Sequence, residues 1–438
     1  MKPVFYSPNV KKQWGMTWIL KPGFSRIKDQ FIGLFILAVS VVACVPKEEA
    51  RKITIANPLS EPLKGLVCKI NSEAAMQSIA SIPEDSLVLM DGDKELPVQF
   101  IKENGITKAI LVQADFAPDE KKPITVKKGV PAVFKAKTQA ELSVKEGGEW
   151  VWLTKKNGNQ QYEYQGGNWK QVNSLRVDKK HTDHSFDIRY EGPGWESDKV
   201  AYRFYLDWRN ATDLFGKKVD TLVLQDVGLD GFDSYHELSD WGADILKVGK
   251  SLGLGTIAHW ADSSANRVAR TDSIFSKITY SGILESKITT KYFGWEYKGG
   301  RTDLTSELSI RAGSYLTKEH LSTNGPIDNF CTGIIKQDNT NVLTSDNDDG
   351  DWGYLATFGV QSLQKDHMGL AVFYCKKDFQ QMTEDKLNHV IVLRPDRNEL
   401  TYYFCGIWEQ DASHINNIEK FKAFLEEQRA LLNQGIYN

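Results

Sequence analysis

Side chains that could carry out acid–base chemistry gather in one stretch of the chain, from Tyr190 to Trp260. Tyr235 and His236 are adjacent within it, and such a pair beside a cation suits β-elimination next to a carboxylate. The cation neutralises the carboxylate so that the neighbouring carbon can lose a proton, while a second group protonates the departing oxygen. We therefore predict His236 as the base, Tyr235 as the acid and Arg209 as a catalytic residue that holds the carboxylate.

The same stretch contains side chains that could bind a sugar. Arg203 and Arg209 would point to one face of a predicted strand and could address one anion, although internal salt bridges explain either arginine equally well. Tryptophans could stack on sugar rings or fill the core. The predicted substrate-binding residues are Arg203, Glu191, Glu196, Trp195, Trp208, Trp241, Lys247 and Lys250.

A metal site is an alternative for part of this stretch. The run from His236 to Asp240 is similar to a zinc-binding motif with aspartate in place of the second histidine. If the run is helical, both side chains share a face, and Asp244 could be a third ligand. His181 and His184 could likewise bind a metal or act as a base, or be exposed loop residues. We expect no cofactor and keep a divalent metal as the alternative.

The N-terminal sequence has the order of a lipoprotein signal peptide. Basic residues precede the apolar run 31–43, which ends at Cys44. This order predicts a signal peptide over 1–43, lipidation of Cys44 and a tether over 44–51. The expected location is the outer membrane, facing the cell surface or the periplasm, with membrane contact through the lipid anchor only.

Composition and periodicity indicate a mainly β protein. The net charge of -3 shows no basic excess, so nucleic acid is not an expected partner. Short alternating runs predict a small immunoglobulin-like β-sandwich over 52–128 and a large β-sandwich over 129–438. Asn417 can cap a C-terminal helix, and the segment 233–251 fits either a helix or a loop. Glycine pairs at 147–148 and 166–167 predict hairpin turns.

Two runs carry a family resemblance: YEGPGWESDKVAYRFYLDWRNATDLFGKK and DGFDSYHELSDWGADILKVGKSLGLG. With the lipidation motif and the small N-terminal β domain, they resemble a family of bacterial polysaccharide-utilisation lipoproteins, defined mainly as a domain of unknown function. The family includes an ulvan oligosaccharide dehydratase. The resemblance implies a β-sandwich similar to galactose mutarotase-like proteins and polysaccharide lyases. It also implies removal of water from the terminal uronic acid of an anionic oligosaccharide, leaving a 4,5-unsaturated sugar.

Two other functions fit the same residues. A non-catalytic glycan-binding lipoprotein would need stacking aromatics without an acid and a base. A glycoside hydrolase would need paired carboxylates, for which Glu191 and Glu196 are the nearest candidates. The sequence carries no indication of the oligomeric state.

Overall fold

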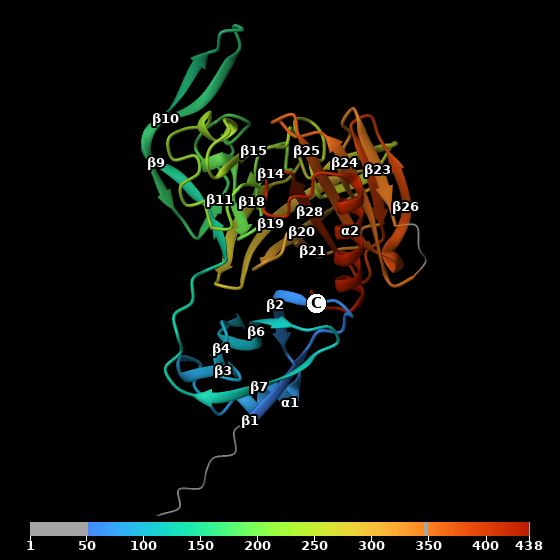
Figure 1. The fold of residues 1–438 in the computed structure, drawn as a ribbon. Helices are drawn as coiled ribbons and strands as arrows, with labels where there is room; N and C mark the ends of the chain where they lie inside the picture. Colours follow the sequence, from blue (N-terminus) through green and yellow to red (C-terminus); the bar gives the residue numbers. More distant parts are fainter. Residues whose placement is uncertain (1–50, 346–348, 438) are drawn as a thin grey trace, which may run out of the picture. The chain divides into compact units, whose positions relative to one another are not determined.

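The computed structural model describes residues 51–345 and 349–437. The predicted signal peptide and the lipidation site at Cys44 lie outside these residues. The described part consists mainly of β-strands, and its longest helix lies near the C-terminus (Figure 1), which confirms the predicted mainly β class. None of the helices in the described part is long and apolar enough to cross a membrane.

Two antiparallel sheets form the first β-rich region, with strand orders β1-β7-β3-β4 and β2-β6-β5. Its elements are β1 (Arg51–Ala56), β2 (Leu63–Ile70), α1 (Glu73–Ile79), η1 (Glu84–Ser86), β3 (Leu87–Asp91), β4 (Lys94–Glu95), β5 (Val98–Glu103), β6 (Ile106–Phe116) and β7 (Lys121–Lys128). Ile110 and Val112 of β6 share one apolar core with Ile124 and Val126 of β7. Each strand therefore buries alternate side chains between the two sheets, as a small sandwich requires.

Residues 129–137 contain no helix or strand and lead into the larger β region. A nine-stranded antiparallel sheet is its largest layer. In spatial order its strands are β11 (Ser174–Arg176), β18 (Ser273–Ser281), β19 (Glu285–Tyr297), β20 (Gly300–Arg311), β21 (Thr317–Thr323), β28 (Glu399–Trp408), β25 (His367–Cys375), β24 (Trp352–Val360) and β23 (Thr340–Thr344).

Two five-stranded sheets accompany the nine-stranded sheet. The first consists of β15 (Gly242–Asp244), β14 (Thr212–Lys217), β13 (Ala201–Phe204), β12 (Gly194–Ser197) and β8 (Thr138–Glu141). The second consists of β17 (Ser264–Arg267), β16 (Ala258–Ala261), β22 (Phe330–Ile335), β27 (Asn388–Leu393) and β26 (Phe379–Glu384). Trp195 and Tyr202 of the first share one buried core with Tyr292 and Phe404 of the nine-stranded sheet, so the layers pack as a large sandwich.

β9 (Ser143–Thr154) and β10 (Gln160–Gln171) form a separate two-stranded sheet. The prediction that glycine pairs at 147–148 and 166–167 mark hairpin turns is wrong. Gly148 pairs with Gly166 inside one long hairpin, whose turn lies between Thr154 and Gln160. A Cβ atom at Gly148 would approach the carbonyl oxygen of Gln165 to 2.3 Å, so glycine here permits close strand contact.

The C-terminal helix α2 (Ile418–Asn433) confirms the prediction made from capping and periodicity. The Asn417 side chain accepts a hydrogen bond from the Lys420 amide at 2.9 Å, which satisfies a free donor of the first turn. Phe421 and Leu425 are buried in a core that includes Phe358 of β24. Figure 1 shows α2 beside β24.

The segment 233–251 is not the amphipathic helix that apolar spacing permitted. It begins with a 3₁₀ turn, η3 (Ser234–His236), and continues through β15. Gly242 has φ +136°, and a Cβ atom there would lie 1.8 Å from the carbonyl oxygen of Gly216. Pairing with β14 therefore overrides the helical periodicity at this glycine. The remaining 3₁₀ turns are η2 (Arg189–Glu191) and η4 (Lys376–Asp378).

Candidate functional site

A cavity of about 410 Å³ lies between the β9–β10 hairpin and two loops, around residues 186–191 and 228–235. The hairpin contributes aromatic rings and a lysine, and the loops contribute two acidic residues, Glu191 and Asp230, and two tyrosines. The residues that define its chemistry are Lys145, Tyr164, Trp169, Phe186, Tyr190, Glu191, Phe232 and Tyr235. Glu191 and Tyr235 were predicted site residues, and the structure places both on one cavity wall.

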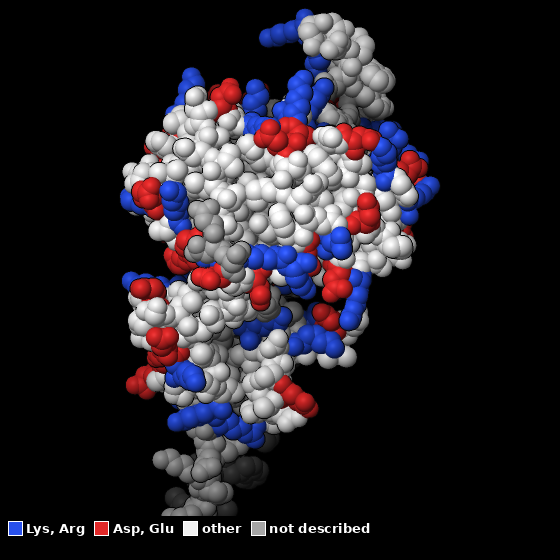
Figure 2. All heavy atoms as spheres, turned by 90° about the vertical axis from the view of Figure 1, so that its right-hand side faces the viewer, with Lys and Arg blue, Asp and Glu red and all other residues white. Residues whose placement is uncertain are grey.

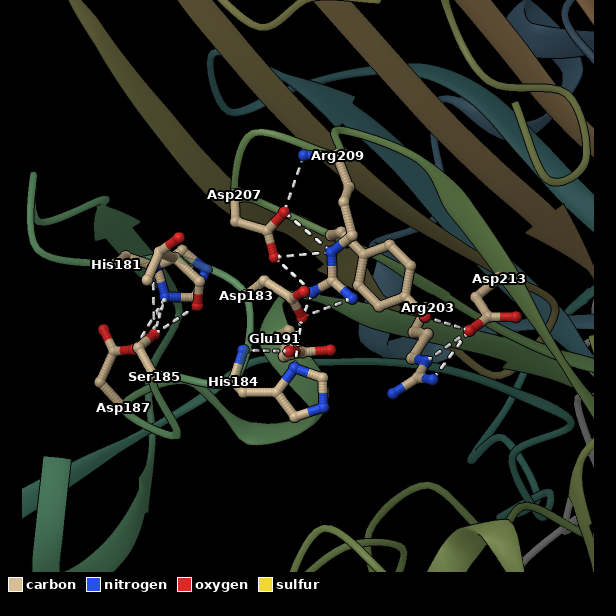
Figure 3. A network of polar contacts seen from close by, with 12 residues as sticks. His181, Asp183, His184, Ser185, Asp187, Glu191, Arg203, Asp207, Arg209 and Asp213 are labelled. Atoms are coloured by element: carbon tan, nitrogen blue, oxygen red, sulfur yellow. Dashed lines mark hydrogen bonds and ion pairs between the residues drawn. The ribbon is translucent and has the colours of Figure 1, made fainter. Parts of the chain in front are cut away.

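Arg209 lies at the centre of an ionic network beside this cavity (Figure 3). Its guanidinium forms ion pairs with Asp207, with Asp183 at 3.0 Å and with Glu191 at 2.9 Å. The guanidinium also lies 3.8 Å from the centre of the Tyr205 ring. Arg209 is therefore occupied by carboxylates of its own chain, which corresponds to the salt-bridge interpretation left open by the sequence.

Arg203 has its own set of ionic partners, separate from those of Arg209. It lies in β13, whereas Arg209 lies in the turn that follows, so the two arginines do not share one strand face as predicted. Arg203 donates to Asp213 at 2.8 Å and also forms an ion pair with Asp244. Its Nη1 donates to the Tyr235 hydroxyl at 3.0 Å. Burial, together with the charge of Asp213, raises the pKa of Asp244 far above its ordinary value.

Tyr235 is placed to act as a proton donor. Its side chain is buried, and burial raises its pKa above the ordinary value even though the charge of Arg203 opposes this rise. Tyr235 is therefore protonated at neutral pH. Its ring borders the cavity, and Arg203 fixes the hydroxyl oxygen.

His236 supports Tyr235 from outside the cavity lining. The two ring centres are 4.6 Å apart, and the His236 Nδ1 donates to the carbonyl oxygen of Phe232 at 2.9 Å. Burial and then the charge of Arg203 lower its pKa, so the ring is neutral near pH 7. The Nε2 atom lies 3.4 Å from Asp244. His236 does not border the cavity in this conformation.

His181 and His184 both belong to the network in Figure 3. His181 is buried, and its Nδ1 lies 2.8 Å from Asp187. Burial disfavours its charged form, but the hydrogen bond to Asp187 and the charges of Asp187, Asp207 and Glu191 together outweigh burial and raise the pKa of His181. The His184 ring contacts Asp183, whose hydrogen bond raises the pKa of His184. His181 is therefore not an exposed loop residue, whereas the His184 side chain is 42% exposed and lies in a turn, as the alternative interpretation expected.

Backbone strain is concentrated around the same groups. Non-glycine residues with positive φ occur at His184 (+58°), Phe186 (+58°), Tyr190 (+37°), Glu191 (+71°) and Asn210 (+41°). Such conformations are costly and persist where surrounding contacts hold them, often at functional sites. The strain places the Glu191 carboxylate between the Arg209 guanidinium and the backbone amide of His184, which donates to it at 2.9 Å.

Two predicted substrate-binding residues are enclosed in the protein. Glu196 has a fully buried carboxylate that pairs with Lys217 at 2.7 Å and accepts hydrogen bonds from the amides of Val223 and Leu224. Trp195 is 1% exposed, and its indole nitrogen donates to Thr317. Neither side chain can contact a ligand in this conformation, because both are used in packing.

The other predicted binding residues are spread over the surface. Trp208 and Lys250 border a different groove, described below. Lys247 is exposed, and Trp241 is partly buried against Phe215. These four residues therefore do not converge on the cavity that holds Tyr235.

The metal alternative at His236, Asp240 and Asp244 does not form as predicted. Asp240 is exposed, and Asp244 is paired with Arg203. Within the described ranges, the side chains close enough to share an ion are instead Asp183, His184 and Glu191, whose ligand atoms lie within 4.8 Å of one another. Arg209 already neutralises two of these carboxylates, so we assign no catalytic step to a metal.

Lys145 is among the cavity residues that the sequence did not predict, together with Tyr164 and Trp169. It borders the cavity from β9, and burial lowers its pKa. Its ammonium lies 5.0 Å from the centre of the Trp169 ring. No carboxylate of the described chain forms an ion pair with it, which leaves the charge available to a ligand. A lysine in a polar hairpin has no distinguishing sequence signal, because only the tertiary fold brings it to the site.

Three solved structures share part of the fold at low similarity. A glycosyl hydrolase family 38 protein from Enterococcus faecalis has 8% identity and a TM-score of 0.41, over 87% of this chain and 46% of that protein. An alpha-mannosidase from Enterococcus faecalis V583 has 7% identity and a TM-score of 0.33, over 87% and 45%. A TPR-domain containing protein from Parabacteroides distasonis has 9% identity and a TM-score of 0.28, over 62% and 55%.

The chain thus spans less than half the length of the first two of these proteins. No curated protein matches it in sequence. One family model does match, over residues 55–437, which is most of the chain. The chain therefore belongs to the family described as a domain of unknown function, DUF4861.

Proposed function

We propose that the protein is an acid–base enzyme that removes water from the terminal uronic acid of an anionic oligosaccharide. The observation that carries the proposal is that three residues of suitable chemistry border one cavity: Lys145, which has no ion-pair partner among the described residues, Tyr235 and Glu191. The resemblance to the ulvan oligosaccharide dehydratase supports the same substrate class and reaction.

In this proposal the substrate carboxylate is bound by Lys145 and not by Arg203 or Arg209. Both arginines are fully engaged by internal carboxylates, and moving either would expose buried charges. Binding of the substrate to Lys145 leaves no internal carboxylate without a partner, because Lys145 forms no ion pair with a carboxylate in the described part of the chain. Trp169 and Tyr164 border the same cavity and provide ring faces for the sugar.

The elimination then needs one proton acceptor and one proton donor. A base takes the proton from C5, the electron pair forms the C4=C5 double bond, and the C4–O bond breaks. Tyr235 gives its proton to the departing oxygen, which leaves as water. Glu191 borders the cavity and takes the role of base in place of His236, which stacks against Tyr235 and keeps it in position.

The conjugated double bond gives this proposal a direct assay. Uronic oligosaccharides incubated with the protein should show a rise in ultraviolet absorbance. Tyr235→Phe removes the transferable proton and keeps the ring, and general acid catalysis contributes about 10²–10⁴-fold, so the rate should fall by that factor. Lys145→Met should raise KM for the charged substrate.

Matched controls separate catalysis from folding. Lys128→Met changes an exposed lysine of the small sandwich and should leave both kcat and KM unchanged. Thermal unfolding of each variant reports whether the fold persists. Full activity in a folded Tyr235→Phe protein would remove Tyr235 from the mechanism.

A further inference from the structure

A second, larger groove lies apart from the cavity. Its volume is about 1140 Å³, and its lining has no residue in common with that of the cavity. It is bordered by β17, the start of β20 and the loops that carry Trp208, Lys250 and Lys386. Space of this size accommodates several sugar rings.

The groove has the opposite charge balance to the whole chain. Six basic and three acidic residues border it, whereas the chain has a net charge of -3. On the face shown in Figure 2, by comparison, acidic and basic side chains are interspersed. The basic residues of the groove are Lys250, Arg267, Arg270, Lys298, Arg301 and Lys386.

The acidic residues do not neutralise most of these cations. Asp262 pairs with Lys298, and Glu296 lies 3.8 Å from Arg301. Asp385 accepts hydrogen bonds from the amides of Leu387 and Asn388, each at 2.8 Å. Within the described ranges, the four other cations have no carboxylate partner: Lys250, Arg267, Arg270 and Lys386.

Trp208 and Tyr297 are the aromatic residues that border the groove, and Arg267 lies against Trp208. Trp208 is 42% exposed, which is unusual for so large an apolar side chain. The Arg267 guanidinium lies 5.5 Å from the centre of its ring, and one of its nitrogens donates to the carbonyl oxygen of Ser251 at 3.2 Å. The other guanidinium nitrogen atoms make no ion pair in the described part of the chain, so they can bind an anion.

We infer that this groove is a second binding site, for an anionic oligosaccharide that carries uronate or sulfate groups. The four unpaired cations bind the charged substituents, and the exposed Trp208 ring stacks on a sugar. Nucleic acid fits less well because, among the described lining residues, Trp208 and the half-buried Tyr297 give few surfaces for successive bases, and the chain has no general basic excess. The site is independent of the proposed elimination.

Binding to three probes tests the inference: a heparin hexasaccharide, neutral cellohexaose and a single-stranded oligonucleotide of similar charge. Titration calorimetry at low ionic strength should show binding of the heparin hexasaccharide alone, weakened by added salt. The Arg267→Gln, Arg270→Gln double variant should bind at least about tenfold more weakly, because it loses two charge-assisted contacts. Trp208→Ala should also weaken binding.

Two control variants distinguish binding in the groove from the proposed elimination. Lys127→Gln with Lys128→Gln removes the same number of charges from the small sandwich and should leave affinity unchanged. Tyr235→Phe should bind the hexasaccharide normally even when elimination is lost. Unchanged affinity in the arginine double variant, or equal binding of cellohexaose or the oligonucleotide, would overturn the assignment.

Discussion

Replacing Arg209 with methionine should destabilise the protein strongly. The guanidinium contacts Asp183, Asp207 and Glu191, and the side chains of the last two are 0% and 3% exposed. Water cannot replace the lost partner at Asp207, whereas Glu191 also borders the cavity. Leaving a buried charge uncompensated costs about 3–5 kcal/mol, and we expect a cost in that range from Asp207.

This loss is large against the total stability of a typical domain, about 5–15 kcal/mol. Urea unfolding followed by tryptophan fluorescence measures it at pH 7 and again at pH 5. The difference between wild type and Arg209→Met should shrink as the pH falls, because protonation removes the uncompensated negative charges.

Arg301→Met is the matched control for Arg209→Met. Its side chain is 51% exposed and its partner Asp272 is 64% exposed, so the cost should stay below about 1 kcal/mol. A cost at Arg209 equal to that at Arg301 would refute the claim that the buried network depends on this guanidinium.

Two further predictions concern buried pairs elsewhere. The pKa of His181 is raised above 6.5 by Asp187, so the stability from this pair is present below about pH 6.5 and is lost as the pH rises through the raised pKa. Asp187→Asn should abolish that loss in melting temperatures measured at pH 6 and 8, and a persistent loss would assign it to other groups. Lys217→Met should cost about 3–5 kcal/mol in urea unfolding, because it leaves Glu196 buried without its partner. Adding Glu196→Gln should recover part of this cost, and no recovery would contradict the ionic explanation.

Local signals in the sequence predicted local structure well. Asn417 and the apolar spacing behind it identified helix α2, since a cap and an amphipathic face are properties of one segment.

Sequence patterns were less informative where the local structure depends on residues far away in the chain. The spacing around Trp241 fitted a helix, but pairing with β14 makes Gly242–Asp244 a short strand in a segment that is otherwise mainly loop. For Arg203 and Arg209 the sequence left open a shared anion or internal salt bridges, and the turn between β13 and β14 gives each its own carboxylates.

The sequence predicted some of the residues that border the cavity. Tyr235 and Glu191 lie on the cavity, as a cluster of polar and aromatic residues suggested. Lys145 comes from a hairpin about 90 residues earlier in the chain than Tyr235, and nothing in its neighbours distinguishes it from a solvated lysine. Trp195 was predicted to stack on a sugar ring or to fill the core. It lies in the core because its strand faces the nine-stranded sheet.

Mass spectrometry of uronic oligosaccharides after incubation with the protein tests the central proposal most directly. The cavity chemistry predicts that intact oligomers lose one water each, and that Tyr235→Phe prevents this loss. Cleavage into shorter chains, or unchanged oligomers in the presence of folded wild-type protein, would contradict it.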